Sequence, residues 1–293
     1  MTDVQVLILQ RFYVVLMAFL LGSAVSLLAW RMGYYQISLS EKGPKSLLKW
    51  YHVFGVFALF LLVELVVTPA VYLAWFYLKN GTFVTKGTLH LDPVQRGWFN
   101  LLAIFCVLVA MLFCLKVIGK EKRQLVWGNW KKVGNIFFGI MTWFIAYPWV
   151  VVVSQLIGIL LQVSYKGPHV DQVAVKYVKE TITHPYLLGF TIFSIVAIVP
   201  VIEELLFRGF LQTWIKGKWG RGKAIVGSSL IFALFHFSTT QGMENVELLP
   251  SLFVLACFLG FIRERQGSLW ASIGLHGTFN FISIAMILLT SEK

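Results

Sequence analysis

The chain has 293 residues, of which 58% are hydrophobic and 13% charged, with a mean hydropathy of +0.77. This apolar content is well above that of a soluble domain and indicates an integral membrane protein. The net charge of +12 does not indicate nucleic-acid binding, because the basic residues cluster at the ends of apolar segments, where anionic headgroups are natural partners. We therefore expect membrane lipid, and no nucleic acid, as a partner.

Eight apolar segments are candidates for crossing the bilayer, which takes about 20 residues per helix. In chain order they are residues 12–30, 50–78, 97–116, 134–163, 186–215, 223–240, 247–263 and 267–290. The sixth carries His236, Thr239 and Thr240 near its end, and the seventh is short, so a version with seven spans or a re-entrant segment is the alternative. The predicted fold is all-α, a polytopic transmembrane bundle with a catalytic cavity between its late helices.

The loops differ in their content of lysine and arginine. The first, third, fifth and seventh hold four, six, four and two basic residues, whereas the second, fourth and sixth hold three, three and none. Sixteen against six predicts that the odd loops are cytoplasmic and that both termini lie on the outer side, in a plasma or inner membrane. The fourth loop, at about 164–185, has valines at helical spacing and is expected to hold a short amphipathic helix.

The fifth segment carries two adjacent carboxylates and an arginine, and ionisable groups at bilayer depth are functional-site candidates by default. On a helix, Glu204 and Arg208 are four residues apart and share a face, whereas Glu203 and Arg208 lie roughly 140° apart around the axis. Arg208 is therefore expected to neutralise Glu204. Glu203 is left as a candidate proton acceptor, and Pro200, just before the pair, could bend the helix and free backbone carbonyls beside it.

Two later segments add histidines. Phe232 and His236 are four residues apart in the sixth segment, and His276 and Asn280 are four apart in the eighth. Counting about 1.5 Å per residue from the basic ends places Glu203 and these polar groups roughly 13 to 20 Å into the membrane. They could therefore meet in one cavity.

These three motifs, in this order, resemble those of the CAAX protease and bacteriocin-processing family (CPBP, or Abi) of intramembrane endopeptidases, which includes the type II CAAX prenyl endopeptidases. The resemblance covers residues 186–290, a CPBP-like helical core, while residues 1–185 carry transmembrane helices without an assigned motif, within a single membrane domain overall. It implies that Glu203 activates water held by His236. It also implies that His276 and Asn280 stabilise the oxyanion, while Glu204 and Arg208 support the site.

The motif residues allow two interpretations of metal dependence. Glu203, His236 and His276 have the donor types of a catalytic zinc site, but the His-Glu-x-x-His pattern of helical zinc proteases is missing from the sequence. Metal-independent water activation is the favoured interpretation, with no cofactor required, and zinc is the alternative. The expected substrate is a membrane-associated peptide or protein, prenylated if the activity is of the CAAX type.

Two other functions use similar residues. A proton-coupled transporter also buries glutamate and histidine and could use Pro200 in a broken helix, but no internal repeat is visible in the sequence. A non-catalytic scaffold or immunity protein of the same fold would not need the motif residues, all of which are intact here. Hydrolysis is therefore the favoured prediction.

Overall fold

The computed structural model describes residues 3–39, 47–81, 92–164 and 172–291. Helices dominate this part of the chain, and its only β pairing is an isolated bridge between Gly128 and Ser268. Seven helices within it are long and apolar enough to cross a membrane. The protein is thus an all-α, multi-pass membrane protein, as its composition predicts.

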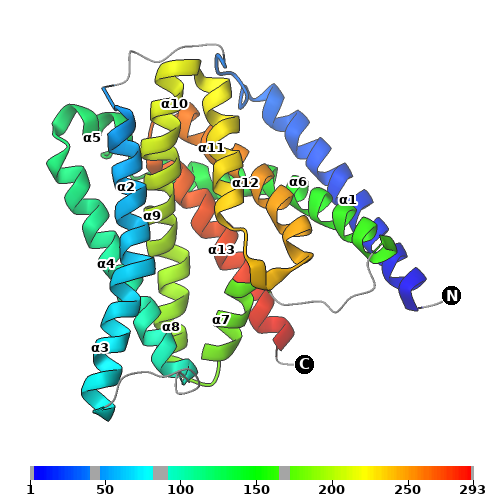
Figure 1. The fold of residues 1–293 in the computed structure, drawn as a ribbon. Coiled ribbons are helices and arrows are strands. Elements are labelled where there is room, and N and C mark those ends of the chain that lie inside the picture. The colour runs from blue at the N-terminus through cyan, green and yellow to red at the C-terminus, as the bar shows by residue number, and fades with distance from the viewer. Residues whose placement is uncertain (1–2, 40–46, 82–91, 165–171, 292–293) are drawn as a thin grey trace.

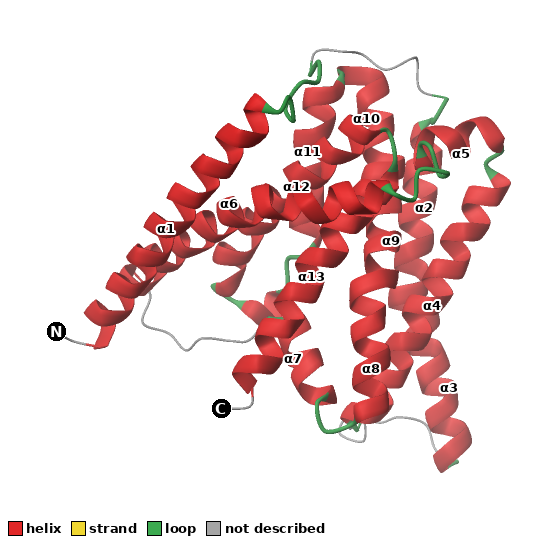
Figure 2. Cartoon of the chain, turned by 180° about the vertical axis from the view of Figure 1, so that it is seen from behind, coloured by secondary structure: helices red, strands yellow, loops and turns green. Residues whose placement is uncertain are grey.

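The first half of the chain supplies four of the seven spans. They are α1 (Asp3–Arg31); α2 (Trp50–Leu62), which continues through η1 (Val63–Val67) into α3 (Thr68–Asn80); α4 (Pro93–Val117); and α6 (Asn135–Ser164). A short helix, α5 (Lys120–Trp127), joins α4 to α6. Figures 1 and 2 show α2, α3 and α4 standing side by side, whereas α1 and α6 lean away from them as a packed pair.

The second half supplies the other three. The fifth span is one long helix made of α8 (Pro185–Phe193), η2 (Ser194–Ile198), α9 (Val199–Glu204), η3 (Leu205–Leu211) and α10 (Gln212–Trp219). It is followed by α11 (Arg221–Phe235), the 3-10 turn η4 (Thr239–Gln241), α12 (Glu244–Gln266) and α13 (Leu269–Ser291). The expected helix in the fourth loop is also present, as α7 (Val173–Thr181).

The predicted sixth span needs a correction. We expected a helix over 223–240, but α11 ends at Phe235 and has 15 residues, too few to count among the seven spans. Its length is about 22 Å, short of the roughly 30 Å of a hydrocarbon core. The polar run that begins at Ser238 ends the helix, because Asn245 hydrogen-bonds the backbone of this run in a non-helical conformation.

The odd-numbered loops meet at one end of the molecule. Arg221 donates to the carbonyl of Ser38, linking the fifth loop to the first, and Arg265 donates to that of Tyr34, linking the seventh to the first. The Asn129 amide donates to the Gly267 carbonyl at 2.9 Å, which adds the third. The prediction that these basic loops share one side is therefore confirmed; that this side is the cytoplasm remains a prediction.

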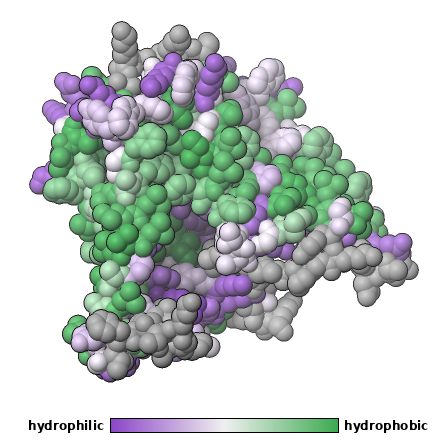
Figure 3. All heavy atoms as spheres, in the orientation of Figure 1, coloured by the Kyte–Doolittle hydropathy of each residue, from purple (hydrophilic) through white to green (hydrophobic). Residues whose placement is uncertain are grey.

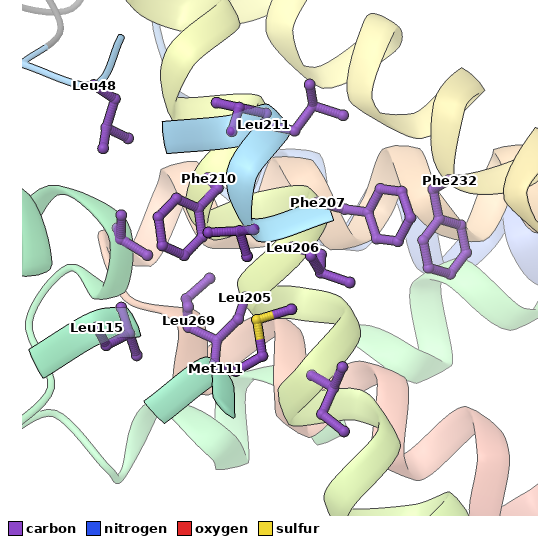
Figure 4. Close-up of a cluster of buried hydrophobic side chains, with 14 of the residues drawn as sticks. Leu48, Met111, Leu115, Leu205, Leu206, Phe207, Phe210, Leu211, Phe232 and Leu269 are labelled. Atoms are coloured by element: carbon purple, nitrogen blue, oxygen red, sulfur yellow. The ribbon is translucent and has the colours of Figure 1, made fainter. Parts of the chain in front are cut away.

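The core lies around η3. Phe207 and Phe210 are fully buried there among side chains from α2, α4, α11 and α13, as Figure 4 shows. On the other side of α13, Gly139 of α6 and Gly274 of α13 sit so close to the facing backbone that a Cβ at either would collide with it. Small residues permit this close helix crossing, which places α13 beside the middle of the bundle.

Candidate active site

The acidic motif lies where the fifth span changes its helical geometry. The π-helical segment η2 precedes α9, which carries Glu203 and Glu204, and the π-helical segment η3 follows it. Such π segments inside α-helices are frequent at functional sites, because they shift the face on which the next side chains point. The glutamates thus sit on one short α-helical turn between two irregular segments.

Glu204 and Arg208 form a fully buried ion pair, with 3.0 Å between Oε1 and Nη1. Arg208 also donates from Nη2 to the carbonyl of Ala256 and lies over the ring of Phe232, 4.4 Å from its centroid. This is the pairing that the four-residue spacing predicts. Because Arg208 makes all these contacts, its charge is held in place on the interior side of the site.

His276 lies between the two glutamates. Its Nδ1 is 2.9 Å from Oε1 of Glu204, and its Nε2 is 3.7 Å from Oε2 of Glu203. A carboxylate oxygen that already accepts from Arg208 requires a donor from the imidazole, so Nδ1 carries a hydrogen when Glu204 is ionised. The ring is thereby fixed with Nε2 directed at Glu203.

His236 approaches Glu203 from α11. Its Nδ1 is 2.9 Å from the carbonyl oxygen of Phe232, which can only accept, so Nδ1 carries the hydrogen. In the neutral ring Nε2 is then an acceptor, and it lies 3.9 Å from Oε2 of Glu203. That oxygen is buried and has no hydrogen-bond partner within the described chain. Two imidazoles and one unbonded carboxylate oxygen therefore converge from α13, from the residue that follows α11, and from α9.

Asn280 bonds to a backbone carbonyl of the fifth span. Its Nδ2 donates to the carbonyl of Ile195 at 2.9 Å. In η2 the amide of Val199 bonds to Ser194, five residues back, so the next donor for Ile195 would be residue 200, which is proline and has no N–H. The carbonyl that Pro200 leaves unpaired is thus satisfied by Asn280.

The site is closed on one side and open on the other. The side chains of His276, Glu204 and Arg208 are at most 6% exposed, whereas those of Glu203 and His236 retain 20% and 32%. Figure 3 shows a hollow in this face of the molecule, between the α8–α9 column and the connection from α11 to α12, with hydrophilic side chains in its depth. Glu203 and His236 are thus the side chains of the site that are open to the surroundings.

Glu203, His236 and His276 are the side chains that could hold a metal ion. Two imidazole Nε2 atoms and a carboxylate are ligand types of catalytic zinc. Nevertheless, the described residues contain no group of three or more His, Cys, Asp or Glu side chains arranged to hold a metal ion. As it stands, the arrangement of these three side chains does not fit a zinc centre.

A comparison with protein families fits this geometry. Residues 185–282 match the family described as type II CAAX prenyl endopeptidase Rce1-like. This part of the chain is Rce1-like. The Rce1-like segment runs from the first residue of α8 into α13 and contains all six predicted site residues, so the resemblance drawn from the motifs is confirmed. At the level of the family it supports a CAAX-type intramembrane protease. No curated protein and no solved structure matched the chain.

Some contacts within the Rce1-like segment could not be found from motifs. The carbonyls of Ala256 and Ile195, which hold Arg208 and Asn280, are backbone atoms and leave no trace in side-chain patterns. Pro200 was the one available signal, because a proline in a span implies an unpaired carbonyl one turn earlier. The stacking of Phe232 on Arg208 was equally hidden, although the aromatic belongs to a recognised motif.

Proposed function

We propose that this protein is an intramembrane endopeptidase that hydrolyses peptide bonds of membrane-associated substrates with a water molecule activated by Glu203. One observation carries the proposal: Oε2 of Glu203 has no hydrogen-bond partner in the described chain, yet it lies 3.7 and 3.9 Å from the Nε2 atoms of His276 and His236. Neither separation is a direct hydrogen bond, so the acceptor capacity of this oxygen is unused. The Glu203 side chain as a whole is 20% exposed, although Oε2 itself is buried, so the proposed water enters from the exposed part of this side chain.

In the proposed reaction, Glu203 is the general base. The water donates one hydrogen bond to Glu203 and the other to Nε2 of His236, whose Nδ1–H is fixed on the Phe232 carbonyl. As the water oxygen bonds to the scissile carbonyl carbon, its proton passes to Glu203. Collapse of the tetrahedral intermediate breaks the C–N bond, and Glu203 returns that proton to the leaving amine.

The developing oxyanion needs donors that are already in place. We assign this role to His276 in its imidazolium form, with Nδ1–H on Glu204 and Nε2–H toward the substrate oxygen, and to the second amide hydrogen of Asn280. Arg208 keeps Glu204 ionised for this purpose through its buried ion pair. The support that Glu204 and Arg208 give is thus electrostatic, and they need not touch the substrate.

The decisive experiment offers prenylated and unprenylated carboxyl-terminal peptides to the purified protein in liposomes. We expect cleavage by the parent protein and none by Glu203→Gln, which keeps the shape of the side chain but cannot accept a proton. Glu64→Gln, which alters a half-buried acid in η1 of another span, is the matched control and should cleave normally. Normal cleavage by Glu203→Gln would refute the proposal, and solute-driven proton uptake without cleavage would instead support a transporter.

Metal dependence is tested in the same assay. On the proposed mechanism, cleavage persists after prolonged treatment with a strong chelator and does not rise when zinc is added back. Loss of cleavage with chelator and its recovery with zinc would assign the two imidazoles and Glu203 to a metal instead.

A further inference from the structure

The connection between α11 and α12 is unusual for a membrane protein. α11 starts at the basic end and, at about 22 Å, is shorter than the roughly 30 Å of a hydrocarbon core. Residues 236–243, the re-entrant loop, follow it largely without α-helix before α12 begins. Non-helical backbone at such depth is tolerated only inside protein or beside a water-filled cavity.

The middle of this loop, residues 238–241, is polar, whereas Phe237 and Met243 on either side of it are exposed apolar side chains. Thr239 and Thr240 are exposed, and the hydroxyl of Ser238 bonds to that of Thr240 at 2.8 Å. The loop begins with His236, whose side chain faces Glu203, and Figures 1 and 3 place it along the hollow in this face. Hydroxyl groups in this position would be costly against lipid but not against water. The loop is thus best explained as a wall of the aqueous entrance to the site.

The buried side chain of Asn245 is bonded to both halves of the loop. Asn245, 4% exposed, accepts from the amide of Ser238 at 3.1 Å and donates from Nδ2 to the carbonyls of Ser238 and Gly242 at 2.7 and 2.9 Å. Gly242 has φ +53°, a conformation that other residues rarely adopt, so the turn into α12 is also specified. The two ends of the loop are thereby tied to the start of α12.

The start of α12 is itself anchored to the early spans. Glu247, in the first turn of α12, accepts from the hydroxyl of Ser154 on α6 at 2.6 Å and lies 3.8 Å from Arg11 of α1. Arg11 also donates to Gln155 of α6. Asn245 therefore links the loop to an element that cannot shift without breaking a polar cluster between α1, α6 and α12.

We propose that residues 236–243 line the water-filled entrance of the site and that Asn245 is the positioning residue that holds His236 against Glu203. The second part rests on the proposed function, whereas the first does not. Asn245 acts through the loop backbone and does not touch the substrate. This proposal also assigns a function to α1 and α6, which lie outside the Rce1-like segment and hold the start of α12 in place.

The first test needs no activity. In a background with Cys106, Cys114 and Cys257 replaced by serine, Thr239→Cys should react with a charged, water-soluble thiol reagent in proteoliposomes permeabilised to it. Leu230→Cys, at a 51% exposed apolar position on α11, is the matched control and should stay unmodified because it faces lipid. Protection of Thr239→Cys to the same degree as Leu230→Cys would overturn the entrance assignment, whatever the enzyme assay shows.

The second test uses kinetics. Asn245→Ala and the isosteric Asn245→Asp, which keeps the acceptor for Ser238 but loses both donated bonds, should lower kcat about 10- to 100-fold with KM changed less than about threefold, because a misplaced group mainly affects the chemical step. Asn135→Ala is the control, since this buried asparagine on α6 makes a 3.5 Å bond at the other end of the molecule. Unchanged kcat in Asn245→Asp, the variant with the smaller change, would overturn the positioning role.

A double-mutant cycle separates positioning from general destabilisation. If Asn245 acts through His236, adding Asn245→Asp to His236→Gln should cause less than about a threefold further loss in kcat, because the group it positions is already gone. If the loss of kcat in the double variant equals the product of the losses in the two single variants, Asn245 supports the fold and does not position His236, and the proposal is overturned. Failure of the proposed function itself would show differently, as normal cleavage by Glu203→Gln.

Discussion

His276 and Glu204 are joined by a buried contact of 2.9 Å between Nδ1 and Oε1. The adjacent glutamate, Glu203, faces the other nitrogen of the same ring. Two neighbouring carboxylates in one helix therefore have different environments: Glu204 is bonded to an arginine and a histidine in the interior, and Glu203 is partly exposed and faces two imidazoles. The two glutamates are therefore expected to have separate roles.

Arg208→Met should destabilise the protein strongly, because it leaves Glu204 as an unpaired charge in the interior. Removal of one partner of a buried ion pair costs about 3–5 kcal/mol. The double variant Glu204→Gln with Arg208→Met should recover much of that loss in thermal unfolding in detergent, yet stay inactive because His276 has lost its carboxylate partner. If the double variant were no more stable than the single one, the pair would not be the source of the effect.

The two histidines should respond differently to removal. His236→Ala is expected to lower kcat by about 10²- to 10⁴-fold, the usual contribution of acid–base and water-orienting groups, with little change in melting temperature, because the side chain is about one-third exposed. His276→Ala should lower both activity and melting temperature, since it opens a gap beside buried Glu204. Parallel measurements of kcat and thermal unfolding check the contrast, which equal melting temperatures would contradict.

Asn280 and Pro200 should be coupled through the carbonyl of Ile195. Asn280→Ala leaves that carbonyl unpaired and should cost about 1–3 kcal/mol, the penalty for an unsatisfied buried group. Pro200→Ala restores a backbone N–H that can reach the same carbonyl, so the double variant should be more stable than Asn280→Ala alone. Because the missing amide also belongs to the proposed oxyanion site, activity should not return. Independent effects of the two changes on stability would argue against the shared carbonyl.

The close crossing of α6 and α13 can be tested at glycine. Gly274→Ala places a methyl group against the backbone of Ile136 and should destabilise the protein by about 1–3 kcal/mol, as overpacking does. It should also reduce activity, because α13 carries His276 and Asn280. Gly55→Ala, where a methyl group would meet nothing, is the control and should change neither. An unaffected melting temperature in Gly274→Ala would mean that the two helices can separate without cost.

Patterns that depend on neighbours in the sequence were predicted well. The long apolar runs correctly predicted a membrane protein. The count of basic residues correctly predicted that the odd-numbered loops lie on one side. The four-residue spacing correctly predicted the ion pair of Glu204 and Arg208. The sixth span was the exception. Its apolar composition suggested a helix to about residue 240, but three hydrogen bonds of Asn245, ten residues beyond the end of α11, stabilise a non-helical loop instead. Such a bond has no signature in hydropathy.

The sequence by itself determined that the protein spans a membrane, which side chains are costly to bury there, and that Glu203 has no cation one turn away on its own helix. The tertiary structure decided which atoms face one another: that His276 lies between both glutamates, that Asn280 bonds to a carbonyl freed by Pro200, and that a re-entrant loop carries His236. The reason is that periodicity fixes contacts within a helix, whereas contacts between helices depend on crossings and π segments that periodicity does not encode.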